Sequence, residues 1–146
     1  MTERPAHLLR RLFELYERGG VDAVLPLVAP DAVLVVPPSL SAEPDVDAGR
    51  EGARRYFEGF EGAIDDVRFE MGDARELAPD SVLARLEVSG VGAATRIPVR
   101  QSAVLHTVVR DGAIVRMAAH PDLESAEAAI ERERGLAGDP EAGRDA

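Results

Sequence analysis

Residues 108–129 read VVRDGAIVRMAAHPDLESAEAA and hold the signals that decide the fold. The dipeptide Asp111-Gly112 favours the positive backbone angle φ that a tight hairpin turn needs, so it joins two antiparallel strands. The second strand covers about Ala113–Ala119, and Asp122 can then cap an amphipathic helix that runs to about Arg134. The segment therefore predicts a hairpin followed at once by a helix.

The chain before this segment divides into a helical half and a strand-rich half. Apolar residues at helical spacing predict three helices, and a valine-rich strand follows the second of them. Segment 39–48 has the composition of a loop. Alternating patterns between Gly, Pro and Asp turns then predict further strands. The expected helices are 6–18, 21–28 and 53–62, and the expected strands are 32–36, 67–71, 81–88 and 94–109. Helices followed by an antiparallel run predict an α+β fold.

Side-chain alternation separates the two faces of the expected sheet. Along the strand at 94–109, one face carries Ile97, Val99, Gln101, Ala103, Leu105 and Thr107. We expect the three helices to cover this apolar face. The opposite face mixes arginines with Val33, Val35, Leu83 and Val104. Because no helix remains to cover this outer face, its apolar residues predict a homodimer formed through it.

Length and composition indicate one globular domain. The chain has 146 residues, of which 45% are hydrophobic, and this is enough for one core. We expect a single domain over residues 1–135 and a disordered acidic tail over 136–146. The absence of cysteine excludes disulfides, thiolate nucleophiles and Cys-ligated metals.

Charge and hydropathy exclude two classes of partner. The 27 acidic residues outnumber the 17 basic residues, so the formal charge of −10 disfavours nucleic acid. The most apolar stretch, Ala23–Pro38, is interrupted by proline and Asp31 and is too short to span a bilayer. No signal peptide is apparent at the N-terminus. We expect no membrane partner and a cytoplasmic protein.

The order of elements resembles the SnoaL-like branch of the nuclear transport factor 2-like superfamily. The stretches that carry the resemblance are ELYERGGVDAVLPLVAPDAVLVVP (14–37), GREGARRYFEGF (49–60) and the segment 108–129. The resemblance implies a cone-shaped, curved antiparallel sheet wrapped around N-terminal helices, with an additional C-terminal helix. It also implies an apolar pocket at the wide end and a dimer. The same fold serves isomerases, cyclases, hydrolases and binding modules, so it does not choose an activity.

The known activities of this family need acidic groups that the sequence lacks at the matching positions. Ketosteroid isomerases have a tyrosine and two aspartates where this chain has Leu12, Val36 and Gln101. SnoaL-type cyclases have an aspartate where this chain has Ala119. Limonene-epoxide hydrolases use an inward Asp–Arg–Asp set, whereas Arg96, Arg100 and Arg116 here are expected to face outward. The resemblance therefore supports none of these activities.

Gln101, the one glutamine in the chain, lies on the expected inner face, where most of the other residues are apolar. Its amide can donate and accept hydrogen bonds but cannot transfer protons near neutral pH. It would anchor a ligand carbonyl or hydroxyl in an apolar pocket, or else bond to a neighbouring backbone group. Tyr16 would reach the pocket rim or lie in the core. The expected pocket residues are Leu12, Tyr16, Val36, Phe57, Phe60, Gln101 and Met117.

The other titratable residues have ordinary structural interpretations. His120, near the pocket mouth, is the best candidate for a general base because the unperturbed pKa of a histidine side chain lies near neutrality. Its alternation with Ala119 favours a structural role instead. His7 is expected to be solvated, His106 to face outward, and Asp45, Asp47, Asp65 and Asp66 to be turn or loop acids. No spacing predicts a metal site, and no cofactor is expected.

Three functions remain open on this basis. The leading hypothesis is a domain that binds a small apolar molecule. The second is a cofactor-independent cyclase, isomerase or dehydratase that acts on a polyketide-like or terpenoid-like substrate, with His120 or a loop aspartate as base. The third is a non-catalytic, dimeric interaction module.

Overall fold

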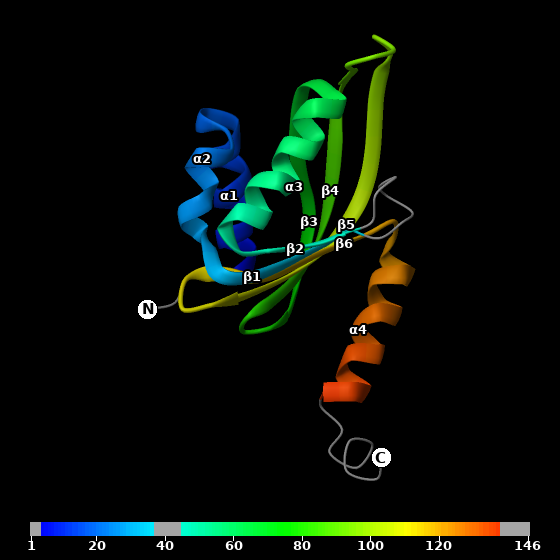
Figure 1. Cartoon of the computed structure of the whole chain (residues 1–146). Coiled ribbons are helices and arrows are strands. Elements are labelled where there is room, and N and C mark those ends of the chain that lie inside the picture. The colour runs from blue at the N-terminus through cyan, green and yellow to red at the C-terminus, as the bar shows by residue number, and fades with distance from the viewer. Residues whose placement is uncertain (1–3, 37–44, 138–146) are drawn as a thin grey trace.

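The computed structural model describes the backbone of residues 4–36 and 45–137 (Figure 1). Side chains are described for the same residues except 36, 45–47 and 133–137. The expected pocket residue Val36 and the loop acids Asp45 and Asp47 thus have side chains outside the described set. Most of the expected acidic tail, residues 138–146, also lies outside it.

Four α-helices and one short 3₁₀-helix form the helical part of the fold within the described residues. They are α1 (Pro5–Gly19), α2 (Val21–Val24), the 3₁₀-helix η1 (Leu25–Leu27), α3 (Gly49–Ala63) and α4 (Leu123–Ala137). At the end of α1, Gly20 adopts a φ of 71° and its N–H donates to the carbonyl of Tyr16. This stops the helix as the Gly19-Gly20 pair predicts. Helix α4 continues to Ala137, two residues into the segment expected to be a tail.

In residues 4–36 and 45–137, six strands form one sheet in the order β2-β1-β6-β5-β4-β3. Their bounds are β1 (Val28–Val36), β2 (Asp45–Ala48), β3 (Ile64–Ala78), β4 (Ser81–Gly92), β5 (Pro98–Arg110) and β6 (Ala113–His120). All neighbours are antiparallel except β1 and β6, which are parallel. The expected α+β fold is confirmed, and the sheet is antiparallel except at this pair, where β1 lies beside the last strand of the chain. Strand β2 was expected to be loop, yet it pairs with residues 33–36 of β1.

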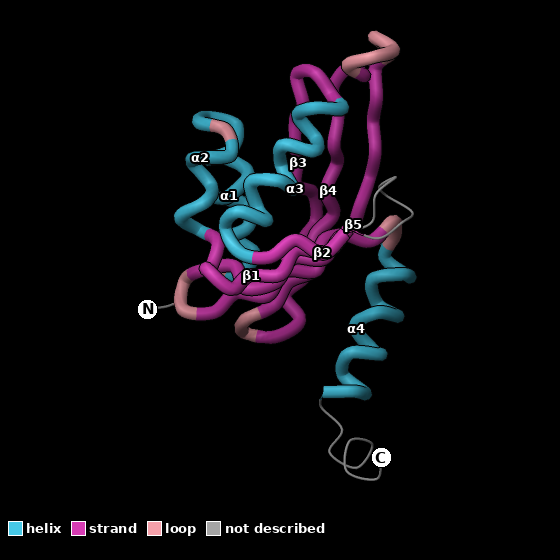
Figure 2. The backbone as a smooth tube through the Cα atoms, in the orientation of Figure 1, coloured by secondary structure: helices cyan, strands magenta, loops and turns pink. Residues whose placement is uncertain are grey.

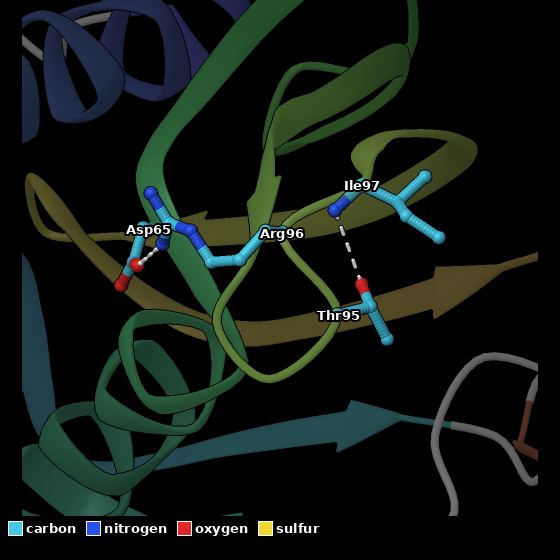
Figure 3. A network of polar contacts seen from close by, with 4 residues as sticks. All are labelled: Asp65, Thr95, Arg96 and Ile97. Carbon is cyan, nitrogen blue, oxygen red and sulfur yellow. Dashed lines mark hydrogen bonds and ion pairs between the residues drawn. The ribbon is translucent and has the colours of Figure 1, made fainter.

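The two hairpins that flank β5 differ in how well the sequence predicts them. Asp111 and Gly112 both have positive φ, 54° and 76°, which confirms the predicted tight turn. The other turn was missed, since residues 94–97 were expected to belong to the strand. Gly92 and Ile97 instead close a turn in which Arg96 has a φ of 60°, and the backbone N–H of Ile97 donates to the hydroxyl of Thr95 (Figure 3).

The helices lie on opposite sides of the sheet. Helices α1, α2 and α3 occupy the concave side, and α4 lies on the other (Figures 1 and 2). Ala126 and Ile130 of α4 pack with Leu83 and Val104 on the outer face. The expectation that no helix covers this face was therefore wrong, because α4 turns back onto it after Pro121. The homodimer stays a prediction. Two of the apolar residues that motivated it, Leu83 and Val104, are covered by α4.

No helix within the described ranges combines the length and apolar character that a bilayer crossing requires.

Candidate functional site

Every aromatic side chain of the protein belongs to one cluster on the concave side. The chain contains two tyrosines, four phenylalanines and no tryptophan. Ring centroids 5.0–5.8 Å apart connect all six in a continuous set: Phe13, Tyr16, Tyr56, Phe57, Phe60 and Phe69. These residues come from α1, α3 and β3, so the cluster packs the two long helices of this side against the edge of the sheet.

A small hollow opens at one side of this cluster, between α3 and the middle of the sheet. Tyr56 and Phe60 contribute its aromatic wall, and the other wall consists of Leu86, Val88, Gln101, Ala103, Leu105 and Ala119. Its volume of about 20 Å³ is room for roughly one water molecule. A larger ligand would have to displace the ring of Tyr56 or Phe60, both of which are only half-buried.

Strand register explains why these residues meet. Gln101 of β5 pairs with Val88 of β4, and two residues further along Ala103 pairs with Leu86. Leu105 pairs with Ala119 of β6. Because alternate residues of a strand share a face, all of these side chains lie on the concave side. Tyr56 and Phe60 are four residues apart on α3, so they share one side of that helix.

Gln101 is the polar group of this hollow that projects from the sheet. It is exposed, whereas Ala103 and Leu105 further along the same face are buried. Gln101 thus lies at the mouth, where its amide can reach both water and a bound molecule. Among the residues whose side chains the structure describes, the eight that line the hollow include neither a carboxylate nor a histidine.

The other expected pocket residues have different positions. Phe60 and Gln101 line the hollow, as described above. Leu12, Phe57 and Met117 are buried in the main core and fill the interior of the cone. Tyr16 is also part of the core.

The expected set also omitted most of the residues that line the hollow. Tyr56 has the same helical spacing as Phe60, and this signal could have placed it in the pocket. The other lining residues are brought together by the register between neighbouring strands. The alternation of residues along a single strand does not predict that register. The residues in question are Leu86, Val88, Ala103, Leu105 and Ala119.

Tyr16 makes a short polar contact beside the cluster. Its hydroxyl donates a 2.6 Å hydrogen bond to Oε2 of Glu61 on α3. Burial raises the pKa of Tyr16 above its ordinary value, and the hydrogen bond to Glu61 and the charge of Glu61 raise it further. Tyr16 therefore stays protonated and donates to Glu61 over the whole physiological range.

The three histidines lie away from the hollow. His120 follows Ala119 on β6, and because neighbouring strand residues face opposite sides, it lies on the outer face. His106 is buried on the same face, opposite Leu83 and Ala118 in the strand register. His7 is exposed near the start of α1.

Asp65 and Asp66 lie next to each other at the start of β3, away from the hollow. Asp65 forms an ion pair with Arg96, which ties the β4–β5 turn to the start of β3 (Figure 3). Asp66 has a φ of 55° at an irregular point of the β3–β4 ladder. Within the described part of the chain, no three His, Asp or Glu side chains come together as metal ligands would.

A family model for the SnoaL-like domain matches residues 9–117, which is well over half of the chain. The chain belongs to the SnoaL-like family. This confirms the resemblance drawn from the sequence. A comparison with curated proteins finds no match.

Solved structures confirm the fold of this SnoaL-like domain. A protein of unknown function from Burkholderia pseudomallei, similar to nuclear transport factor 2, is 16% identical with a TM-score of 0.70, covering 88% of this chain and 97% of its own. A protein with a ketosteroid isomerase-like fold from Catenulispora acidiphila, in complex with trimethylamine, is 18% identical with a TM-score of 0.68, covering 88% and 92%. A proposed SnoaL-like polyketide cyclase from Jannaschia is 15% identical with a TM-score of 0.67, covering 86% and 90%. At these identities the likeness concerns the fold alone.

Proposed function

We propose that this SnoaL-like domain binds a small apolar molecule in the hollow between α3 and the sheet, with Gln101 as its polar anchor. The observation that carries the proposal is the position of Gln101, whose amide stands at the mouth of a hollow with otherwise apolar or aromatic walls. Ligand sites commonly combine such walls with a few hydrogen-bonding groups. The Catenulispora protein of the same fold, in complex with trimethylamine, supports a small ligand.

The ligand class follows from the amide. Gln101 can donate to a carbonyl oxygen and can accept from a hydroxyl, so a small cyclic ketone or alcohol suits the site better than a hydrocarbon of equal size. Aromatic rings on one side and flat aliphatic surface on the other favour a compact ring.

The test compares cyclohexanone with methylcyclohexane by NMR titration. The protein should prefer the ketone, and Gln101→Leu should reduce that preference by roughly tenfold, the equivalent of one hydrogen bond. Ser102→Ala is the matched control, because Ser102 is the next residue of β5 and belongs to the opposite face. Equal preference in the wild type and in Gln101→Leu would refute the proposed anchor.

The enzymatic alternative is a cyclase, isomerase or dehydratase. Its specific motivation is the Jannaschia relative, which is described as a proposed polyketide cyclase. Catalysis by His120 would require the side chain to act from the outer face, away from Gln101. Turnover of a polyketide-like substrate that is lost in His120→Ala would favour this alternative over simple binding, and turnover that survives in that variant would remove His120 from the mechanism.

A further inference from the structure

We propose that the hydrogen bond between Tyr16 and Glu61 is a latch that keeps the hollow closed and thereby limits the size of molecule that it admits. This inference rests on the proposed function, because it concerns the same hollow. It assigns a role to a contact between α1 and α3 that the binding proposal does not use.

The two walls of the hollow differ in how easily they can move. Six of its eight residues lie on β4, β5 and β6, and each of these strands has a hydrogen-bonded neighbour on both sides. Moving any of them would break backbone hydrogen bonds of the sheet. Tyr56 and Phe60 lie on α3 between its two ends, and α3 is not part of the hydrogen-bonded sheet. An opening of the hollow therefore requires movement of α3 or of these two rings.

Restraints on the first half of α3 lie far from Phe60 along the helix. Gly49 approaches the backbone of Pro30, and Nε of Arg50 donates a 3.0 Å hydrogen bond to the carbonyl of Val28. Arg54 forms a 2.6 Å ion pair with Asp22. These contacts fix the start of α3 against β1 and α2.

The second half of α3 is held differently. Glu61 follows Phe60 directly in the sequence, and its carboxylate accepts the hydrogen bond from the hydroxyl of Tyr16. Tyr16 is itself a firm anchor, since it is 8% exposed and stacks on Phe57 with ring centroids 5.0 Å apart. At the helix end, the carbonyl of Ala63 accepts a 3.0 Å hydrogen bond from the backbone N–H of Ala93. Tyr16–Glu61 is thus a side-chain tether directly beside Phe60, on the wall of the hollow that α3 supplies.

The latch makes a quantitative prediction. If a ligand binds only when α3 has opened, its apparent affinity rises in proportion to the open fraction. Amide exchange of the second half of α3 rises by the same factor, because exchange also requires opening. Tyr16→Phe keeps the ring and its stacking but removes the donor, and Glu61→Ala removes the acceptor. Each change should raise both quantities by roughly tenfold.

The experiment measures amide exchange in α3 and benzene binding in the wild type, Tyr16→Phe, Glu61→Ala and Arg54→Gln. Benzene is the probe because it fits an apolar cavity and makes no use of Gln101. The two latch variants should bind benzene about tenfold more tightly, with faster exchange at residues 60–63. Arg54→Gln, which removes the ion pair with Asp22 in the first half of α3, should leave benzene affinity unchanged.

Three outcomes would overturn the latch. Unchanged exchange at residues 60–63 in both variants would show that the hydrogen bond does not restrain α3. Faster exchange without tighter benzene binding would show that this opening does not admit ligand. Absence of benzene binding in the wild type and in both variants would overturn the latch as well. A failure of the proposed function is separate, since it appears as a ketone preference that does not depend on Gln101.

Discussion

The hydroxyl of Tyr16 on α1 lies 2.6 Å from Oε2 of Glu61 on α3, 45 residues later in the sequence. This contact joins the two long helices of the concave side next to the aromatic cluster. It combines a donor on a buried ring with an acceptor on an exposed side chain, so it links the core to the surface. Its consequences for stability and titration can be measured without knowledge of any ligand.

Tyr16 should ionise late. In the variant Tyr56→Phe, Tyr16 is the one remaining tyrosine, so tyrosinate absorbance reports on it alone. Its pKa is raised in the folded protein, mainly by burial. The folded variant should therefore show no tyrosinate near the ordinary pKa of about 10, whereas the denatured variant should titrate there. Stability should be unaffected below that pH and should fall as pH rises beyond it. Ordinary titration in the folded state would contradict the buried, hydrogen-bonded position.

Replacement of the glycine at the start of α3 should destabilise the fold. Gly49 has a φ of 71°, and a Cβ at this position would lie 2.8 Å from the carbonyl oxygen of Pro30. Gly49→Ala should lower the free energy of unfolding by about 2 kcal/mol, through backbone strain and the close contact. Urea unfolding measures this change.

Gly59→Ala is the matched control, in the middle of the same helix. No described atom outside its own helical segment lies within 4 Å of the added Cβ. This substitution should raise the free energy of unfolding by about 0.5–1 kcal/mol, because alanine loses less conformational entropy than glycine. Equal effects of the two substitutions would contradict the tight approach of α3 to Pro30.

Replacement of Thr107 by valine should stabilise the protein. Its side chain is 0% exposed, and its hydroxyl has no hydrogen-bond partner among the described residues. Thr107→Val removes an unsatisfied polar atom at constant shape, so the free energy of unfolding should rise by about 1 kcal/mol. Thr107→Ser keeps the hydroxyl, loses a methyl group and should lower it by about 1 kcal/mol. A destabilising Thr107→Val would show that the hydroxyl has a partner.

Asp122 should make the start of α4 sensitive to acid. Its Oδ1 accepts a 2.7 Å hydrogen bond from the backbone N–H of Ser125. Hydrogen bonds from Ser125 lower the pKa of Asp122, so its contribution to stability is present above the ordinary pKa of aspartate. The contribution should disappear as pH falls through the lowered pKa. In the wild type, the chemical shift of the Ser125 backbone amide should change with pH as Asp122 titrates. In Asp122→Asn this pH dependence should be absent, and a pH dependence that persists in the variant would contradict the cap.

The sequence predicts the fold better than it predicts the site, and particular residues explain the difference. The Asp111-Gly112 turn, the Asp122 cap and the Gly19-Gly20 stop are local signals, and each appears in the structure. The parallel pairing of β1 with β6 depends on residues more than 80 positions apart, for example Leu34 and Met117, and no local pattern specifies it.

The candidate site depends on the same kind of long-range information. Alternation along β5 identifies Gln101 as an inner residue, and the structure places it on that face. The depth of the hollow, by contrast, depends on how Tyr56 and Phe60 pack against strands β4, β5 and β6. Leu12 and Phe57 have the same apolar character as Phe60, and their complete burial follows from packing of α1 against α3 and the sheet. Composition alone does not separate core from pocket.

The proposed contact of Gln101 with a ligand is directly measurable because of the composition of the protein. The chain has one glutamine and no asparagine, so the side-chain amide pair in a nitrogen–proton correlation spectrum belongs to Gln101. The measurement follows this pair during titration with cyclohexanone and, separately, with methylcyclohexane. We expect a saturable shift of the Gln101 amide with the ketone and a much smaller shift with the hydrocarbon. An amide pair that does not move while cyclohexanone saturates the protein, or that never responds to the ketone at all, would contradict the proposed contact.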